Sequence, residues 1–420
     1  MAGRTMNPDP RALRELQQAA RQASDTQLIR LANTLDALPQ RAMAEGVLDA
    51  VRPRLRHIRP ARPLSIPRLL FLTLDPLLVA PRDWRPGQGT VPRSAIMPMA
   101  EHLREAEPVL VAAIEMRMTG AKLTDEVLAA EQGSLLWPAA LRMLPRQPPA
   151  GWVDAGLQTQ SFHEIAMICA TLWQHSEALW RLRMAGRDGP PEAAVRPIFR
   201  TIAAEGPEAV ELCMCALLPF ATQPARVVAV VAGLSQALGP PAERALDRYL
   251  AGVEPGLEGA DLESTASAAS RFSRLLVDLD SSLTRDKPKR AQHLQALRMS
   301  AAQSCVQRLE QETATRLTTP LAAALTLPEI NDLMVKDLES VVRSLRGIGE
   351  STRRLHASGA AERVLAPVIA HLTVLAGTQS ESGPGFVRTD ALRLLEILAG
   401  SAVAARAQST RSQLGMSRPG

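Results

Sequence analysis

Leucine, alanine and valine recur along the second half of the chain at intervals of three and four residues, the spacing of a helix with one buried face. Two such seams are unbroken: Leu262, Ala266, Ala269, Phe272, Leu276, Leu279 and Leu283, then Met334, Leu338, Val341, Leu345, Ile348, Thr352 and Leu355. A looser series lies between them, over residues 288–318. We expect three long helices that pack antiparallel with shallow crossing angles. The alternative is that one seam faces another subunit, which would make the protein a homo-oligomer. Helices over 361–376, kinked at Pro367, and 389–405 complete this half.

Shorter helices are predicted between residues 189 and 258, where proline recurs at a regular interval. Pro191, Pro207, Pro224 and Pro241 are 16, 17 and 17 residues apart, and glycine or glutamine precedes each proline cluster. Proline favours the first turn of a helix and glycine its end, so each interval holds about three turns. Two of these helices give a hairpin of about 33 residues, the length typical of stacked α-hairpin arrays. The signatures of tetratricopeptide and ankyrin repeats are absent.

The first half predicts further helices. Three are expected within residues 8–57, starting near Pro10, at Ser24 or Asp25, and at Pro39. Others are expected at 96–102, 108–118, 124–132 and 134–144, the last interrupted by Pro138. Residues 162–184 form one long helix that is apolar almost all round, and it should therefore be central.

Residues 51–99 differ from the rest, because nine prolines exclude a long helix there. The segment begins with six arginines and no acid before Asp75: Arg52, Arg54, Arg56, Arg59, Arg62 and Arg68. The apolar run 69–79 follows, and then the loop 84–89. The run is too apolar to stay exposed and too short to cross a membrane. It is either a core plug between helices or the anchor of a docking element whose arginines and loop meet an anionic partner.

These patterns predict an all-α protein: short stacked hairpins resembling an α-solenoid, followed by a bundle of longer antiparallel helices. We expect five segments. They are a helical lead-in (1–58), the proline- and arginine-rich segment with its short helices (59–145), the stacked region (157–258), the C-terminal bundle (259–408) and a flexible tail (409–420).

Composition agrees with a globular chain, since 46% of its 420 residues are hydrophobic, 22% are charged and only 3% are aromatic. The net charge of +5 is small for this length. Only four of the 48 basic residues are lysine, a bias that genomic base composition can produce, so it weakens any argument from arginine clusters. The four cysteines lie in apolar helical patterns, and the N-terminus lacks a signal-peptide pattern, so we expect a reducing, cytoplasmic location.

The sequence contains no complete catalytic motif that we recognise. His163-Glu164 opens like a zinc-protease helix, but Met167 stands where the second histidine is required, and His175 would lie about 18 Å away. Cys213 and Cys215 point to different faces of a helix. We therefore expect no catalytic residue, cofactor or metal.

Three functions remain open. The first is a non-enzymatic scaffold or adaptor that binds another protein. The second is binding of nucleic acid or an anionic surface, and the candidate contacts are Arg54, Arg56, Arg59, Arg62, Arg68, Trp84 and Arg85. The third is a helical enzyme with an unrecognised site, near the Trp84 loop or on the helix that carries His163 and His175. Association with a membrane surface through the apolar run is a minor alternative, and no transmembrane segment is expected.

Overall fold

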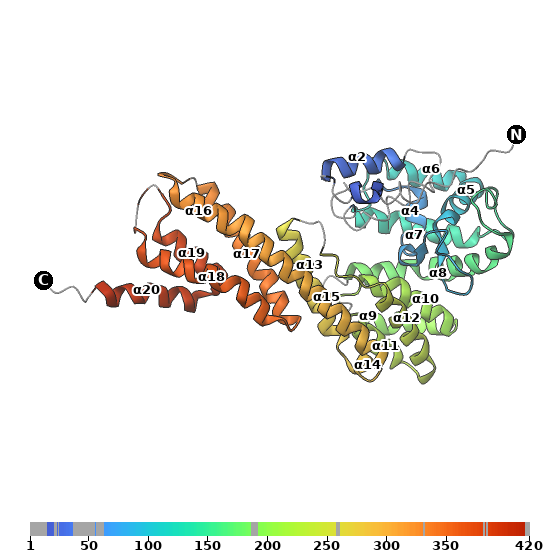
Figure 1. The fold of residues 1–420 in the computed structure, drawn as a ribbon. Coiled ribbons are helices and arrows are strands. Elements are labelled where there is room, and N and C mark those ends of the chain that lie inside the picture. The colour runs from blue at the N-terminus through green and yellow to red at the C-terminus, as the bar shows by residue number, and fades with distance from the viewer. Residues whose placement is uncertain are drawn as a thin grey trace. The chain divides into compact units, whose positions relative to one another are not determined.

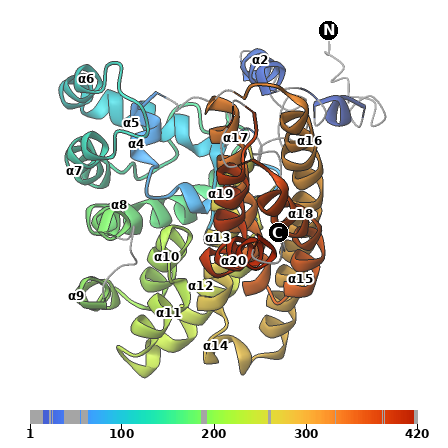
Figure 2. The same cartoon turned by 90° about the vertical axis from the view of Figure 1, so that its left-hand side faces the viewer.

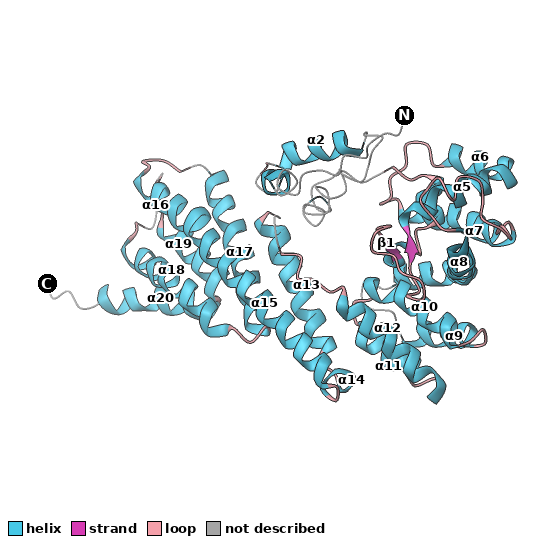
Figure 3. Ribbon diagram, turned by 45° about the vertical axis from the view of Figure 1, so that its right-hand side comes forward, coloured by secondary structure: helices cyan, strands magenta, loops and turns pink. Residues whose placement is uncertain are grey.

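The structure, a computed structural model, describes residues 15–20, 23, 25–36, 55, 63–185, 192–257, 261–330, 332–380, 383 and 385–415. Helices dominate these residues (Figure 1). Their strands are the two-residue β1 (Leu78–Val79) and β2 (Val91–Pro92), which pair in parallel with Leu78 opposite Val91 (Figure 3). The predicted all-α fold is confirmed.

The chain forms two compact units. We call Pro60–Val253 with Asp278–Ala291 the central unit, and Met1–Arg59, Glu254–Val277 and Gln292–Gly420 the terminal unit. This division is coarser than the five predicted segments, which stay a prediction.

The described helices of the central unit are mostly short, although α8 (Phe162–Ala185) has 24 residues. They are α4 (Ile66–Leu70), α5 (Ile96–Ala106), α6 (Pro108–Arg117), α7 (Glu126–Arg142), α8, α9 (Glu192–Ala203), α10 (Pro207–Leu217), α11 (Pro224–Ala232), α12 (Gly239–Ala251) and α14 (Ser282–Arg285). Short 3₁₀ turns lie at Asp75–Leu77, Arg93–Ala95, Thr159–Ser161, Leu218–Phe220 and Gln236–Leu238. The predicted proline starts are confirmed at Pro207 and Pro224. α12 begins two residues before Pro241, because the first turn of a helix tolerates both Pro240 and Pro241.

Neighbouring helices of the central unit pack in a regular order. α8 lies against α7 and α10, α9 against α10 and α11, and α12 against α10 and α11. In Figure 2, α6, α7, α8 and α9 form one row. The stacked-hairpin architecture itself stays a prediction.

The apolar run is buried in the core of the central unit. Leu69, Leu70 and Leu74 have no exposed surface, and Phe71 and Leu77 are at most 2% exposed. α4 is only five residues long, so it leaves main-chain carbonyls that need other donors in the core. Two indoles from α7 and α8 supply donors: Trp137 Nε1 donates to Leu69 O at 3.0 Å, and Trp173 Nε1 donates to Leu70 O at 2.9 Å. Leu69 O also accepts a longer bond from Leu72 N, at 3.3 Å. The run is therefore a core plug between α7 and α8.

Pro138 does not interrupt its helix, and the prediction of two helices there is wrong. α7 continues through it, with Trp137, Ala139 and Ala140 buried around it. Pro138 itself is exposed. Its ring removes one intrahelical hydrogen bond, and the packing of α7 on α4 and α8 outweighs that loss.

A late segment of the chain completes the central unit. Arg290, at the start of α15 (Pro288–Glu312), is only 5% exposed and forms ion pairs with Glu243 and Asp247 of α12. Asp278, near the end of α13 (Leu262–Leu279), accepts a hydrogen bond from Ala225 N at 2.8 Å. Both contacts join residues 278–291 to the helices α11 and α12.

The terminal unit combines long helices, such as the 25-residue α15, with shorter ones. They are α2 (Asp25–Asp36), most of α13 and α15, the π-helical turn Thr313–Thr318, α16 (Thr319–Thr326), α17 (Asp332–Arg354), α18 (Ser358–Thr378), α19 (Arg388–Ala399) and α20 (Ser401–Gly415). α2 confirms the predicted start at Ser24 or Asp25, whereas the starts predicted at Pro10 and Pro39 lie outside the described residues. α17, α18 and α19 lie side by side (Figure 1). The buried Glu339 of α17 binds Arg343 of its own helix and Arg393 of α19.

Two predicted long helices are broken. The first seam ends at Leu279, and Leu283 lies in α14, because Asp280 and Ser281 favour caps and turns over helix interior. The helix predicted over 389–405 is divided at Gly400, whose φ of +94° only glycine adopts without strain. Most of the remaining seam positions, such as Leu276 and Leu345, are buried, whereas Ala266, Met334 and Val341 are only half-buried.

The core plug gives a prediction on stability. Replacement of Leu74 by alanine should lower the free energy of unfolding by about 3 kcal/mol, because the side chain is fully buried. All five tryptophans lie between residues 84 and 180, so urea denaturation followed by tryptophan fluorescence reports on the central unit. Val153, which is 68% exposed, supplies the control: Val153→Ala should change the midpoint little. Equal effects of the two substitutions would contradict a packed core at Leu74.

The end of α17 gives a second prediction. His356 has a φ of +64°, and the bonds from His356 N to Arg353 O and from Ala357 N to Thr352 O form the Schellman motif in which glycine is usual. His356→Gly should therefore stabilise the protein by about 0.5–1 kcal/mol, measured by calorimetry. Gly400→Ala is the opposite control, since a Cβ there meets no atom within 4 Å but the backbone conformation is strained. A loss of stability in His356→Gly would show that the imidazole contributes more than the strain removes.

Candidate functional site

The loop between β1 and β2 carries two of the predicted contact residues, Trp84 and Arg85. The Trp84 ring is half-buried, and its Nε1 donates to Thr90 O at 3.0 Å. Arg85 is exposed, and its guanidinium donates to the carbonyls of Arg82 and Trp84, both at 2.7 Å. The loop is thus closed on itself.

Two neighbouring helices also hold this loop. Gly87 N donates to Glu164 Oε1 of α8 at 2.7 Å, and Arg248 of α12 donates to Gly89 O at 3.4 Å. A Cβ on Gly89 would lie 3.1 Å from the Arg248 guanidinium, so glycine permits this close approach. These polar groups are used to hold the loop against α8 and α12. They are therefore not free to act on a substrate.

Most of the arginine cluster lies outside the described residues: Arg54, Arg56, Arg59 and Arg62. Arg68 is described, in the last turn of α4, where its guanidinium donates to Pro63 O at 2.6 Å. Its assignment to an anionic partner, like that of the loop residues, stays a prediction.

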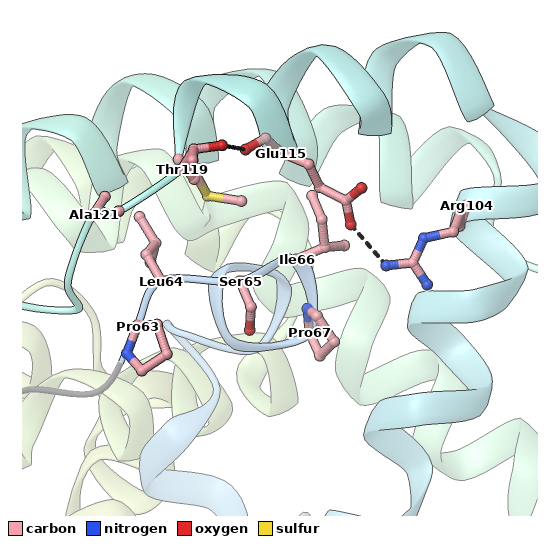
Figure 4. Close-up of a pocket in the computed structure, with 11 residues that line it drawn as sticks. Pro63, Leu64, Ser65, Ile66, Pro67, Arg104, Glu115, Thr119 and Ala121 are labelled. Atoms are coloured by element: carbon pink, nitrogen blue, oxygen red, sulfur yellow. Dashed lines mark hydrogen bonds and ion pairs between the residues drawn. The ribbon is translucent and has the colours of Figure 1, made fainter.

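A small pocket of about 240 Å³ lies beside α4 (Figure 4). Its charged lining residues are Arg104 and Glu115, which are bonded at 2.8 Å, and Arg104 also binds Glu101 at 2.7 Å. These two carboxylates raise the pKa of Arg104. The remaining lining is mostly apolar or main chain, for example Ile66 and Met118. Because its charges are paired, the pocket offers no activated group.

The two histidines of α8 do not meet. His163 is exposed, whereas His175 is buried, with its Nε2 2.8 Å from Glu205 Oε1. Gln174 Nε2 donates to the same carboxylate oxygen at 2.8 Å. His175 therefore joins α8 to the turn after α9. In the part of the chain that the structure describes, no three His, Cys, Asp or Glu side chains are grouped to hold a metal ion.

The cysteines are all buried and free. Burial raises the pKa of the Cys169 and Cys213 thiols, and it raises the pKa of Cys215 and of Cys305 to about 11. A raised pKa leaves little thiolate at neutral pH, and the thiolate is the nucleophile. These thiols therefore act as small apolar side chains.

The three most exposed large apolar side chains among the described residues of the central unit lie on α6 and α7. The exposed fraction is 83% for Val109 and 78% for Met116 on α6, and 70% for Val127 and 52% for Leu135 on α7. Ala112 and Ala113 on α6 are exposed as well. We call Val109, Ala112, Ala113, Met116, Val127 and Leu135 the α6–α7 face.

The two helices of this face form an antiparallel hairpin. They pack on each other, and Arg142 in the last turn of α7 lies 3.6 Å from Glu107 at the start of α6. The sequence could not single out the face, because α6 is apolar on all sides. Val111 and Ile114 are 1% exposed although they resemble Val109 and Met116 chemically. Only tertiary packing distinguishes the two pairs.

No protein-family model, curated protein or solved structure matches this chain. Among the described helices, α18 is long and apolar enough to cross a membrane, with a mean hydropathy of 1.3. A third of its most apolar stretch is buried, and it packs on α17, α19 and α20. A core helix has the same properties, so the expected absence of a transmembrane segment stays a prediction.

The thiols give a prediction on reactivity. At about pH 8, a pKa of about 11 leaves a thiolate fraction roughly 100-fold smaller than that of an ordinary cysteine. Native protein should therefore react with iodoacetamide at least ~100-fold more slowly than unfolded protein, measured by mass spectrometry of the labelled peptides. Protein labelled in concentrated urea is the control. Rapid native labelling of Cys215 or Cys305 would reopen nucleophilic or redox chemistry.

Proposed function

We propose that this protein is a non-enzymatic helical scaffold that binds another protein, and that the α6–α7 face is its contact surface. The observation that carries the proposal is the exposure of four large apolar side chains on two neighbouring helices. Soluble proteins expose single apolar residues everywhere, but gathered ones are typical of binding sites. Val109 and Met116 are seven residues apart, two turns along the same side of α6.

The packing of the central unit supports a scaffold role. The order in which α7, α8, α10 and α12 pack on each other is what a stack of helical hairpins requires. In such a stack the core holds the inner faces while the outer faces of successive helices supply an extended surface. The face is also rigid, because α7 is fixed to the core plug by Trp137.

The chemistry of the described residues favours binding over catalysis. Arg104 and Glu115 are ion-paired, the buried His175 lies 2.8 Å from a Glu205 carboxylate oxygen, and burial raises the pKa of the cysteine thiols. Charged groups that are paired in this way hold a structure in place but do not activate a substrate. An enzymatic role therefore has weaker support than a protein partner.

The proposal predicts a protein partner that stays bound at high salt concentration. The tagged full-length chain, purified from its native cells at low and at ~0.5 M salt, should retain a stoichiometric protein, because apolar contacts are not screened. Met116→Asp and Val127→Asp should each release it, since a carboxylate in an apolar interface loses its hydration. Mass spectrometry of the retained fraction identifies the partner.

Val153→Asp is the matched control, because it makes the same change at an equally exposed valine outside α6 and α7. It should keep the partner. Retention of the partner by both Met116→Asp and Val127→Asp would exclude the face as the contact surface. Nucleic acid or lipid that is lost at ~0.5 M salt, with no protein bound, would instead favour the arginine segment.

A further inference from the structure

An open groove of about 760 Å³ lies along the first two turns of α7. Val127 and Leu128 of α7 and Met184, near the end of α8, form its apolar part. Its other lining residues are Thr124, Asp125, Glu126 and Glu131. The groove therefore combines apolar side chains with three carboxylates, and none of its described lining residues is basic.

The three carboxylates differ in how many hydrogen-bond donors or positive charges lie near them. Asp125 accepts a hydrogen bond from Lys122 N at 2.7 Å. Burial lowers the pKa of Arg183, and the negative charge of Glu126 opposes that shift in part. The Arg183 guanidinium itself is occupied by two rings, 3.8 Å from the centre of Phe220 and 4.7 Å from that of Trp180. Glu131 is exposed, and its carboxylate forms no ion pair with a described residue. Within the described part of the chain, no basic side chain therefore complements Glu131.

The order of side chains along α7 determines which residues of a partner can pack in the groove. Val127, Glu131 and Leu135 are successive at four-residue spacing, and all three are exposed. They form a stripe about 12 Å long in the order apolar, acidic, apolar. A second helix packed along α7 at a shallow angle meets this stripe with its own residues i, i+4 and i+8.

We propose that the groove binds a cationic amphipathic helix of a partner protein, with an apolar residue at i, lysine or arginine at i+4, and an apolar residue at i+8. The basic side chain reaches Glu131, and its aliphatic stem covers Leu128 and Met184. The apolar residues lie on Val127 and Leu135. This inference rests on the proposed function, because it specifies the partner of the same surface.

Selection of displayed peptides by the full-length protein tests the inference. The library is an alanine- and glutamine-rich helix of about 16 residues, randomised at i, i+4 and i+8. The native protein should enrich apolar, basic and apolar residues at these positions. The Glu131→Lys protein should enrich an acidic residue at the middle position, and a synthetic basic peptide should bind it about 10-fold more weakly than it binds native protein at low salt.

Glu310→Lys is the matched control, an exposed glutamate on α15 whose reversal should leave the selection unchanged. Melting temperatures of the variants verify that they fold. No enrichment, or the same middle residue for native and Glu131→Lys proteins, would overturn the inference. If Val127→Asp still releases the natural partner in that case, only the cationic helix fails; if it does not, the proposed function fails as well.

Discussion

The central unit depends on the hydrogen bonds that two tryptophans donate to the main chain of α4. The apolar run begins in a helix of only five residues, which cannot satisfy all of its carbonyls, and in the core no water replaces the missing donors. An indole suits this position because it adds a large apolar surface and one donor. Trp137 and Trp173 belong to different helices, so the same short segment fixes both α7 and α8. The α6–α7 face and the groove are therefore attached to a rigid base.

The fold was predictable where local chemistry and tertiary packing agree. Proline at the start of α10 and α11 and the buried seam of α17 follow from rules that act within one helix. The sequence-based predictions are wrong where tertiary packing or a single backbone angle determines whether a helix continues. Pro138 remains in a helix because its neighbours are buried on α4 and α8, whereas Gly400 ends one because of its positive φ. Neither result is visible in hydrophobic spacing.

The candidate surface was less accessible to prediction than the fold. The sequence directs attention to rare features, such as the arginine cluster and Trp84, while α6 is an ordinary apolar segment. Val109 differs from Val111 only in the direction of its side chain relative to the core. Glu131 is also one of many glutamates in the sequence. Only its position beside the groove makes it a candidate binding residue. A binding surface made of common residues is defined by what the fold leaves uncovered.

The central unit is discontinuous in the chain, and this affects how the protein is made. Residues 60–253 leave the ribosome before residues 278–291. Until then the carboxylates of α12 lack their ion pairs with Arg290, and the N-terminus of α11 lacks its hydrogen bond to Asp278. Domains usually fold as units during synthesis, with the N-terminal one first. Here the central unit is complete only after residue 291 has emerged, and the terminal unit, which contains residues from both ends, is completed last. A nascent chain that has emerged to a point between residues 253 and 291 would therefore carry an unfinished central unit, which chaperones can bind.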